Sequence, residues 1–450
     1  MELPLVPLIL VNKTSKALLY SFLTLVFSFS ASADSIQDCL DQISQDPKNP
    51  PTGLSDSVMT YAPVTVDKLN NRCDEQGSLE DVKQALNYQL ESCRRRSPDG
   101  RTHFQIACRE YSRDEWCLQT TEEMLALAES APDFKTFLQQ VRTEFDWYQS
   151  SGLSQPSPDG KFSAGQTQVT GYYSPLIKAS RTRQGSFKYP IYGRPDDLVE
   201  SDPSDPEGCG YNWCLKNVDD TLSPYYTKEE IDNGALTGEG LEIAYVEDPI
   251  DVAFMMVQGS ASLDIQNKSQ SDDILRLSYA AQNGRKLYML GRVIKCDGGK
   301  VEDYSSMNGI RNYLHSHPEK IKKLLHYDQS YIFFEEVDDG PIGFEGVPVT
   351  GMHSIAVDRS QVPMGISTLI DVQKSVPATD CAITSSFAVA QDVGGAISGA
   401  HFDWFQGTGE EAEARAGGLD NPGWFYIGLK KGLGHPVGNC LKATDKNLKN

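Results

Sequence analysis

The sequence has too few basic residues for a protein that binds nucleic acid through its phosphates. Its 450 residues include 41 Lys and Arg against 62 Asp and Glu, which gives a net charge of −21. A chain this anionic repels phosphate backbones and acidic lipid surfaces, so we expect no nucleic-acid partner. Hydrophobic residues make up 39% and aromatic residues 9%, which is enough for ordinary globular cores and argues against wholesale disorder.

The motifs of several common catalytic and metal sites are missing as well. The chain has no phosphate-binding P-loop, no G-x-S-x-G elbow, no paired-histidine zinc motif and no C-x-x-C pair. The segment 407–412 imitates a dinucleotide fingerprint, but it lacks a βαβ unit and the acidic residue about twenty positions later. His315 and His317 lie two apart on an expected helix, so they face different sides. We therefore expect neither a metal nor a cofactor.

Long hydrophobic runs are absent after the first 33 residues. Lys13 and Lys16 precede an apolar run at 17–30, and residues 31–33 form a small-x-small cleavage pattern. This order predicts a signal peptide over residues 1–33. A membrane anchor is the alternative, but the apolar run is short for crossing a bilayer. Cleavage would remove two lysines and one glutamate and leave the mature chain still more anionic.

All ten cysteines follow the predicted signal peptide. An even number of cysteines in an exported chain indicates disulfides and an oxidising compartment. Cys209 and Cys214 could close a small loop, and the segment from Cys73 to Cys117 is typical of a helical region stapled by local bonds. The remaining pairings stay open, because spacing alone does not determine connectivity. The other cysteines are Cys39, Cys93, Cys108, Cys296, Cys381 and Cys440.

The expected secondary structure of the chain changes near residue 166, from mainly helices to short strands. Residues 34 to about 160 are expected to be mainly helical, with the clearest helix beginning near Asp133, and 151–165 is a polar link. Short β-like runs then follow, separated by turns. The expected strands are 167–173, 188–192, 241–245, 252–257 and 286–294, and the expected short helices are 228–233, 306–315 and 410–416.

Two aspartates near the C-terminus are the strongest candidates for chemistry. Asp392 follows an apolar run and precedes a glycine pair, whereas Asp403 lies in an alternating segment between aromatic residues. Asp403 shares a strand face with Phe405, and Phe402 and Trp404 share the other. An aspartate against aromatic surface is costly to ionise, so its pKa should rise and it could act as a general acid. The alternative interpretation is that Asp392 is an ordinary turn residue and Asp403 lies on the solvated face of a strand. The spacing of the two aspartates does not decide between a catalytic and an ordinary role.

Three further segments have residue types that suit binding. Tyr172 and Tyr173 stand beside Gly171, and aromatic faces next to exposed backbone suit sugar rings. Residues 257–260 place an amide and a hydroxyl after what looks like an apolar strand. Asp358 is most simply a turn aspartate that accepts backbone hydrogen bonds. Core or turn packing is the commoner explanation for each segment taken singly.

In this order, the segments resemble the membrane-bound lytic murein transglycosylase A (MltA-type) family. The similarity covers roughly residues 130–430 and includes the blocks 170–173, 181–185, 257–260, 279–284, 331–334, 356–365 and 392–409. The last two blocks also resemble the three-aspartate domain, named for positions matching Asp358, Asp392 and Asp403. Asp38 directly before Cys39 does not suit a lipid-attachment site, and Ala261 stands where a glycine is more typical.

The resemblance implies a mainly β fold with some helices and two domains. A double-psi β-barrel would be assembled from residues 131–177 plus 341–450. A second, β-rich domain would be inserted at 178–340, with glycan bound in the groove between the two. Residues 34–130 would form a helical, cysteine-containing N-terminal region.

The resemblance also implies an activity: cleavage of the β-1,4 bond between N-acetylmuramic acid and N-acetylglucosamine in peptidoglycan, with formation of a 1,6-anhydromuramic acid end. By motif match, Asp403 is the acid/base and Asp392 its support. The candidate substrate-binding residues are Thr170, Gly171, Tyr172, Gln258, Gly259, Ser260 and Asp358. Arg181 and Arg183 could neutralise muramyl carboxylates or form a solvated basic turn.

The expected partner is therefore the peptidoglycan glycan strand, and the expected form is a monomer. The expected place is the periplasm, with association with the outer membrane left open. Two alternatives remain: a non-catalytic cell-wall glycan-binding protein on the same barrel, and a muramidase in which Asp392 activates water.

Overall fold

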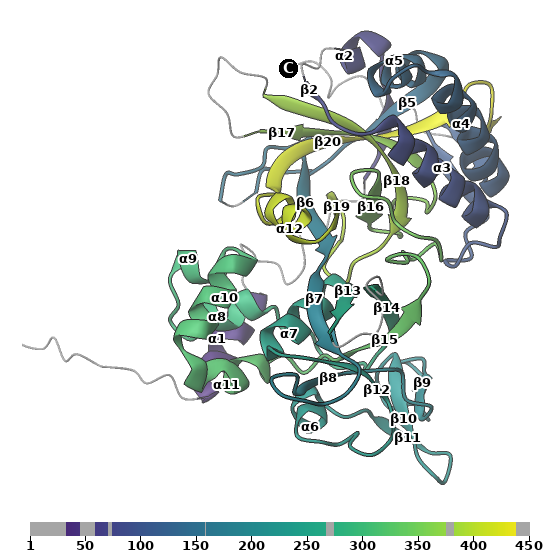
Figure 1. The fold of residues 1–450 in the computed structure, drawn as a ribbon. Coiled ribbons are helices and arrows are strands. Elements are labelled where there is room, and N and C mark those ends of the chain that lie inside the picture. Colours follow the sequence, from purple (N-terminus) through teal and green to yellow (C-terminus); the bar gives the residue numbers. More distant parts are fainter. Residues whose placement is uncertain are drawn as a thin grey trace, which may run out of the picture.

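The computed structural model describes residues 33–45, 59–70, 74–157, 159–266, 274–374 and 382–437. It contains two β-rich bodies, one above the other in Figure 1. The chain passes from the upper body to the lower one between strands β6 (Thr167–Ser174) and β7 (Leu176–Ser180). The predicted signal peptide lies outside the described residues, except for Ala33, where α1 begins. Within those ranges, no helix combines the length and apolarity needed to cross a membrane.

The upper body is built on a closed barrel of six strands. A final pairing between β6 and β20 closes the ring. In order around the ring, the strands are β20 (Asp420–Lys430), β17 (Ser367–Gln373), β18 (Ile383–Asp392), β16 (Ser354–Val357), β19 (His401–Thr408) and β6 (Thr167–Ser174). Two more, β5 (Phe145–Ser150) and β1 (Tyr61–Pro63), extend the sheet from β20. The predicted β-barrel is present, and its double-psi description stays a prediction.

Helices from the first part of the chain cover one side of this barrel (Figure 1). Their apolar faces form one cluster with Leu369, Phe387 and Val389 of the barrel strands. The helices are α2 (Val66–Asn70), α3 (Leu79–Cys93), α4 (Thr120–Ser130) and α5 (Phe134–Glu144), with a π-helical turn, η1, at Asp114–Gln119. As predicted, Asp133 caps α5, because its side chain accepts the backbone N–H of Thr136.

Short strands accompany these helices. The hairpin of β3 (His103–Ile106) and β4 (Arg109–Ser112) pairs with β21 (His435–Pro436) near the C-terminus, and β2 (Asp74–Glu75) pairs with β18. A disulfide joins Cys93 of α3 to Cys117 of η1, within the segment where local stapling was predicted.

The lower body is a six-stranded sheet with helices beside it. Its strands in order are β15 (Ile332–Val337), β14 (Ile274–Gln282), β13 (Ser260–Ile265), β7 (Leu176–Ser180), β12 (Glu242–Val246) and β8 (Tyr189–Tyr192). A smaller sheet contains β9 (Leu198–Glu200), β10 (Trp213–Lys216) and β11 (Leu222–Pro224). The predicted Cys209–Cys214 disulfide is present and closes the loop before β10.

Most helices of the lower body form a group at one side of its sheet (Figure 1). They are α7 (Pro249–Gln258), α8 (Leu290–Cys296), α9 (Val301–Tyr304), α10 (Met307–Ser316), η2 (Pro318–Lys320) and α11 (Ile321–Leu325). The short helix α6 (Lys228–Asp232) lies apart from them, and its Ile231 packs with apolar residues of the smaller sheet. The N-terminal helix α1 (Ala33–Gln45) joins the larger group rather than the barrel. Its Cys39 forms a disulfide with Cys296 across 257 residues, a pairing that the spacing of cysteines did not indicate.

Two of the predicted strands are wrong. Residues 252–257 belong to α7, where Asp248 caps the helix and Pro249 occupies its first turn. Residues 286–294 contain no strand, and α8 begins at Leu290. Both are short apolar runs, which periodicity alone does not separate from buried helix. The strands near 167–173, 188–192 and 241–245 and the three short helices, including α12 (Glu410–Gly417), are confirmed.

The contact between α5 and the barrel predicts the effect of one core substitution. Phe387 of β18 is fully buried and meets Phe137 of α5 edge-on, with 5.3 Å between the ring centroids. Phe387→Ala should lower the free energy of unfolding by about 3–5 kcal/mol, because it removes this contact and leaves a cavity. Urea unfolding measures the loss. Val218→Ala, at a fully exposed turn, should change it by less than about 0.5 kcal/mol. Equal effects would contradict the packing.

Candidate active site

The short strand β16 brings the two candidate aspartates together. Ala356 of β16 pairs with Asp392 of β18 on one side and with Asp403 of β19 on the other. The register between β16 and β18 shifts just before Ala356, so that Gln391 is passed over and Asp392 takes its place. Residues paired across a sheet point to the same face, so the small Ala356 side chain lies between the two carboxyls.

Two residues on one face of strand β6 bind the two carboxyls. Thr170 Oγ1 donates to Asp403 Oδ1 at 2.8 Å, and the Tyr172 hydroxyl donates to Asp392 Oδ2 at 2.9 Å. Gly171, between them, points to the other face of the strand, where an added Cβ would lie 2.8 Å from Ala416 Cα of α12. The Thr-Gly-Tyr order therefore places two donors on the site and lets a helix pack against the back of the same strand.

Asp403 lies in a setting that favours its protonated form. Burial, together with the nearby Asp392 charge, raises the pKa of Asp403 to about 7, against the opposing hydrogen bond from Thr170. Its side chain keeps partial contact with solvent, so a substrate atom can reach it. Phe402 and Trp404 point into the barrel core, as the alternating pattern predicted. The arrangement suits a general acid that works near neutral pH.

Asp392 is held more firmly than Asp403. Its Oδ1 accepts the backbone N–H groups of Val393 at 2.9 Å and Phe344 at 3.1 Å, in addition to the Tyr172 hydroxyl on Oδ2. Burial raises the pKa of Asp392 to about 6, while these three hydrogen bonds work to lower it. Among the described residues, neither aspartate forms an ion pair with a cationic side chain.

His401 belongs to the same site and was missed from sequence. Its Nε2 lies 2.8 Å from Thr170 Oγ1, the hydroxyl that donates to Asp403. Burial lowers the pKa of His401 to about 4, so the ring is neutral at physiological pH. Because the Thr170 hydroxyl donates to Asp403, the tautomer with a hydrogen on Nε2 fits this contact. His401 and Asp403 are two residues apart on β19, and this same-face spacing is the signal that could have revealed the histidine.

Asp358 supports the loop before β19. Its Oδ1 accepts the backbone N–H of Ser360 at 2.9 Å, which confirms the expected turn, and its Oδ2 accepts the N–H of Gly399 at 2.7 Å. The carboxylate therefore links the end of β16 to the segment that delivers His401 and Asp403. These contacts leave its role in substrate binding a prediction.

Three predicted binding residues lie where β6 passes from the barrel to the lower body. Gln258 is the last residue of α7, not the residue after a strand, and its Oε1 accepts the backbone N–H of Tyr173 at 3.0 Å. Gly259 caps α7 in the left-handed region, at φ 71°, and Ser260 is buried at the start of β13. Arg181 pairs with Glu336 on the sheet of the lower body.

Comparison of the sequence with known proteins matches the chain to a family. The MltA specific insert domain matches residues 168–335, and the 3D domain matches residues 353–428. Membrane-bound lytic murein transglycosylase A of Escherichia coli (strain K12) is 33% identical over 284 residues, which is 61% of this chain and 69% of that protein. The chain belongs to the membrane-bound lytic murein transglycosylase A family. The Vibrio cholerae protein of the same name is 30% identical over 274 residues, with 59% and 66% covered.

Solved structures agree with this membership. The membrane-bound lytic murein transglycosylase of Agrobacterium tumefaciens has a TM-score of 0.64 at 27% identity, covering 82% of this chain and 98% of that one. Escherichia coli MltA with bound chitohexaose has a TM-score of 0.59 at 26% identity, covering 82% and 94%. The MltA-type fold is therefore confirmed, and membership of the family places the chain among enzymes of the lytic transglycosylase type.

The raised pKa of Asp403 predicts an unusual dependence of stability on pH. In the unfolded chain this carboxyl ionises near 3.8, and in the folded protein near 7, so the folded state retains a proton over the interval between them. Stability should therefore fall as pH rises from about 4 to about 7. Asp403→Asn removes this cost, so the variant should melt at a higher temperature than the wild type at about pH 8, with a gain that shrinks toward about pH 4.

Asp358→Asn provides a matched control with the opposite sign. Burial works to raise the pKa of Asp358, but hydrogen bonds from Ser360, Gly399 and Gln361 outweigh it and hold the pKa below 3.8. This variant should therefore lose stability at neutral pH. Thermal melts at several pH values measure both, and a loss of stability in Asp403→Asn at about pH 8 would show that Asp403 ionises at low cost.

Proposed function

We propose that the protein is a peptidoglycan lytic transglycosylase that uses Asp403 as its single acid/base. It cleaves the β-1,4 bond between N-acetylmuramic acid and N-acetylglucosamine and forms a 1,6-anhydromuramic acid end. The observation that carries this proposal is the geometry of Asp403, a half-buried residue whose carboxyl accepts the Thr170 hydroxyl and lies beside Asp392 across Ala356. Burial, which raises the pKa of this carboxyl to about 7, agrees with the role. Membership of the MltA family supports it, and the bound chitohexaose named for the Escherichia coli protein supports a β-1,4-linked amino-sugar chain as substrate.

The reaction balances with one carboxyl. Protonated Asp403 donates its proton to the glycosidic oxygen while the bond from that oxygen to C1 of the muramyl residue breaks. The C6 hydroxyl oxygen of the same muramyl residue then bonds to C1, and its proton passes to the Asp403 carboxylate. The acid is thereby restored and no water is consumed. Thr170 holds the Asp403 oxygen through both steps, since its hydroxyl can donate to the carboxylate that forms.

Asp392 supports the reaction through its charge. Burial raises the pKa of both aspartates, and the three donors around Asp392 favour its charged form, so Asp392 is the one that ionises more readily. Its carboxylate then stabilises the positive charge that develops at C1 and favours the proton on Asp403. Asp392 also has three hydrogen-bond donors around it, which suits a fixed charge better than a group that must cycle a proton.

Glycan binding is proposed between the barrel and the lower body, next to the same face of β6. Tyr172 packs against Phe405, with 5.0 Å between ring centroids, and gives the site an aromatic wall. The hydroxyls of Thr170 and Tyr172 already donate to the two aspartates. We therefore expect these residues to contribute to glycan binding through the shape of the site and not through hydrogen bonds to the sugar. Gly171 contributes by letting α12 approach the strand from behind.

The proposed location is outside the cytoplasm, in the periplasm. Every cysteine that the structure describes is in a disulfide, which requires an oxidising compartment. The curated relatives are named membrane-bound, which supports an association with the cell envelope.

The products of digestion test the reaction. Purified mature protein should release anhydromuropeptides from bacterial sacculi, identified by mass spectrometry of the soluble fragments. Release of reducing-end products alone would show hydrolysis with water activated by Asp392. Binding to sacculi without release would show a non-catalytic glycan-binding protein.

Two asparagine variants separate the roles of the aspartates. Asp403→Asn should abolish release while glycan binding persists, because an amide of nearly the same shape cannot donate and regain the proton. Asp392→Asn should slow release by about 10²-fold without changing the product, because it removes a supporting charge. Full activity of Asp403→Asn would contradict the assignment.

A further inference from the structure

The backbone that holds Asp392 belongs to the segment 340–350, which returns the chain from the lower body to the barrel. This segment folds into a tight loop, with Gly343 N–H bonded to Val347 O at 2.9 Å and Gly346 N–H to Gly343 O at 2.9 Å. The loop lies directly on the end of β18, because Glu345 N–H donates to Gln391 O at 3.0 Å. Its apex delivers the Phe344 N–H to Asp392 Oδ1 at 3.1 Å.

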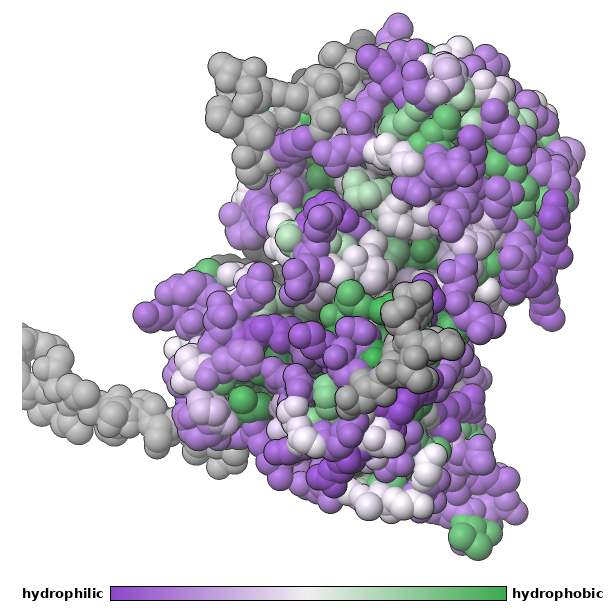
Figure 2. Space-filling model, viewed as in Figure 1, coloured by the Kyte–Doolittle hydropathy of each residue, from purple (hydrophilic) through white to green (hydrophobic). Residues whose placement is uncertain are grey.

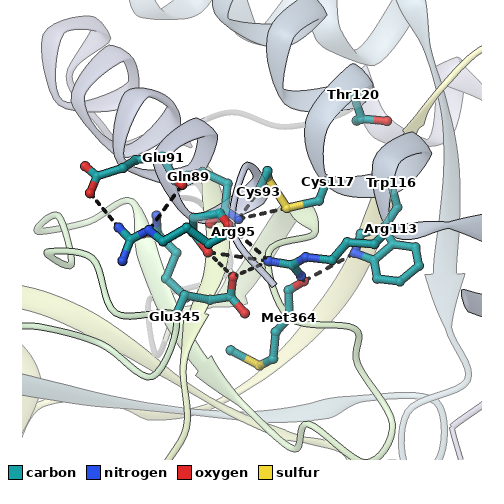
Figure 3. The surroundings of a disulfide bond; sticks show 12 residues. Gln89, Glu91, Cys93, Arg95, Arg113, Trp116, Cys117, Thr120, Glu345 and Met364 are labelled. Atoms are coloured by element: carbon teal, nitrogen blue, oxygen red, sulfur yellow. Dashed lines mark hydrogen bonds and ion pairs between the residues drawn. A yellow bond between two sulfur atoms is a disulfide. The ribbon is translucent and has the colours of Figure 1, made fainter. Parts of the chain in front are cut away.

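The side chain of Glu345 points away from Asp392, into the N-terminal part of the chain. Its side chain is 0% exposed, and Oε2 accepts hydrogen bonds from the Ser92 hydroxyl and from Arg113 Nη2, the latter at 2.9 Å. Arg113 Nη1 also donates to Met364 O, at 3.3 Å, in the turn before β17 (Figure 3). Moving a buried carboxylate away from its cationic partner costs free energy, because the charge is then left uncompensated. The ion pair with Arg113 therefore fixes the position of Glu345.

The partners of Glu345 are tied to each other by the Cys93–Cys117 disulfide. Ser92 immediately precedes Cys93 at the end of α3, and Arg113 lies at the start of η1, one turn before Cys117. Gln89 donates to both sulfur atoms, at 3.3 Å and 3.1 Å, and fills the space between the two elements (Figure 3).

Two more contacts join this region to α3 and the residues just after it. Arg95, two residues after α3, donates from Nη1 to Gly346 O of the loop at 3.4 Å, and Gln391 of β18 donates from Nε2 to Ala85 O of α3 at 3.2 Å. All these N-terminal residues precede residue 168, outside both matched family domains. The support behind Asp392 is therefore supplied by a part of this chain that the two family domains do not include.

We propose that Glu345 is a positioning residue for Asp392, and that the Cys93–Cys117 disulfide keeps the two partners of Glu345 in place. This inference rests on the proposed function, in which Asp392 must be ionised and correctly placed. Glu345 is buried, so a substrate on the surface of the site does not reach it. It acts by fixing the loop whose Phe344 N–H binds the Asp392 carboxylate.

The charged and titratable groups around Asp392 set the direction of the expected effect. They are Tyr172 on β6 and Asp403 on β19. The guanidinium of Arg359 lies 4.9 Å over the Phe344 ring and forms no ion pair with Asp392 among the described residues. The Phe344 N–H favours ionised Asp392, so its loss raises the pKa of Asp392. Since the reaction needs Asp392 ionised, the acid limb of the kcat/KM profile moves to higher pH.

Glu345→Gln tests the proposal. The amide keeps the size of the side chain and can still accept the Ser92 hydroxyl, but it loses the ion pair with Arg113. We expect kcat for anhydromuropeptide release to fall about tenfold with little change in KM, and the acid limb to move to higher pH. Hydrogen exchange of peptides covering 340–350 should accelerate, a readout that needs no activity. An unchanged pH profile with unchanged exchange would overturn the proposal.

Glu75→Gln is the matched control for charge and burial. Glu75 pairs with Arg142 at 2.5 Å, with side chains 15% and 2% exposed, and lies beside Ser385 at the other end of β18. This variant should lose stability, but the pH of the acid limb and the rate of hydrogen exchange in peptides covering 340–350 should stay as in the wild type. If Glu75→Gln moved the acid limb as much as Glu345→Gln, the effect would be general loosening of the barrel.

Paired serine variants test the disulfide. Replacing Cys93 and Cys117 by serine should shift the acid limb in the same direction as Glu345→Gln and accelerate exchange of 340–350. Replacing Cys209 and Cys214, which close a five-residue separation on the lower body, should do neither. A wild-type protein that released no anhydromuropeptides would contradict the proposed function itself. An active wild type, with variants that keep its pH profile and its exchange of 340–350, would contradict only the positioning role.

Discussion

The constraint on which this site depends is the cost of burying two carboxyls beside each other, with no cationic side chain of the described residues paired to either. Burial raises the pKa of both Asp392 and Asp403, and the charge of Asp392 raises that of Asp403 further. A cationic partner would have removed this effect, because it would hold both groups ionised. The protein instead surrounds them with hydroxyl and backbone donors, which orient the carboxyls and leave a proton on one of them near neutral pH.

The barrel supplies the geometry that this constraint needs. β16 stands between β18 and β19, and a one-residue register shift beside Ala356 turns Asp392 to the same face as Asp403. β6 then closes the ring and brings one donor to each carboxyl. The difference between the two aspartates arises from their neighbours. Asp392 has three donors, two of them backbone, whereas Asp403 accepts the Thr170 hydroxyl, which in turn contacts the neutral ring of His401.

The parts of this site that lie within one strand could be predicted from the sequence. Alternation placed Phe402 and Trp404 on the strand face opposite to Asp403, where the structure puts them in the core, and the aromatic setting indicated a raised pKa for Asp403. Contacts between distant segments could not be predicted in this way. The Phe344 donor, Glu345 with Arg113, and the Cys39–Cys296 bond all join residues that no local pattern relates.

Secondary structure was predicted well only where the pattern was distinctive. The alternating strands and capped helices were found, but the apolar run 252–257 was taken for a strand when it belongs to α7. That error also changed the interpretation of Gln258, which ends a helix and binds the Tyr173 N–H of β6. Its amide therefore ties the lower body to the barrel strand that carries Thr170 and Tyr172.

Direct titration of the Asp403 carboxyl by ¹³C nuclear magnetic resonance, with Asp403→Asn used to assign its signal, tests the central claim. The structure predicts that this carboxyl titrates with a pKa of about 7, while Asp358 titrates below 3.8 in the same sample. A pKa for Asp403 close to the ordinary aspartate value of 3.8 would contradict the claim, because the group would then have no proton to donate near neutral pH.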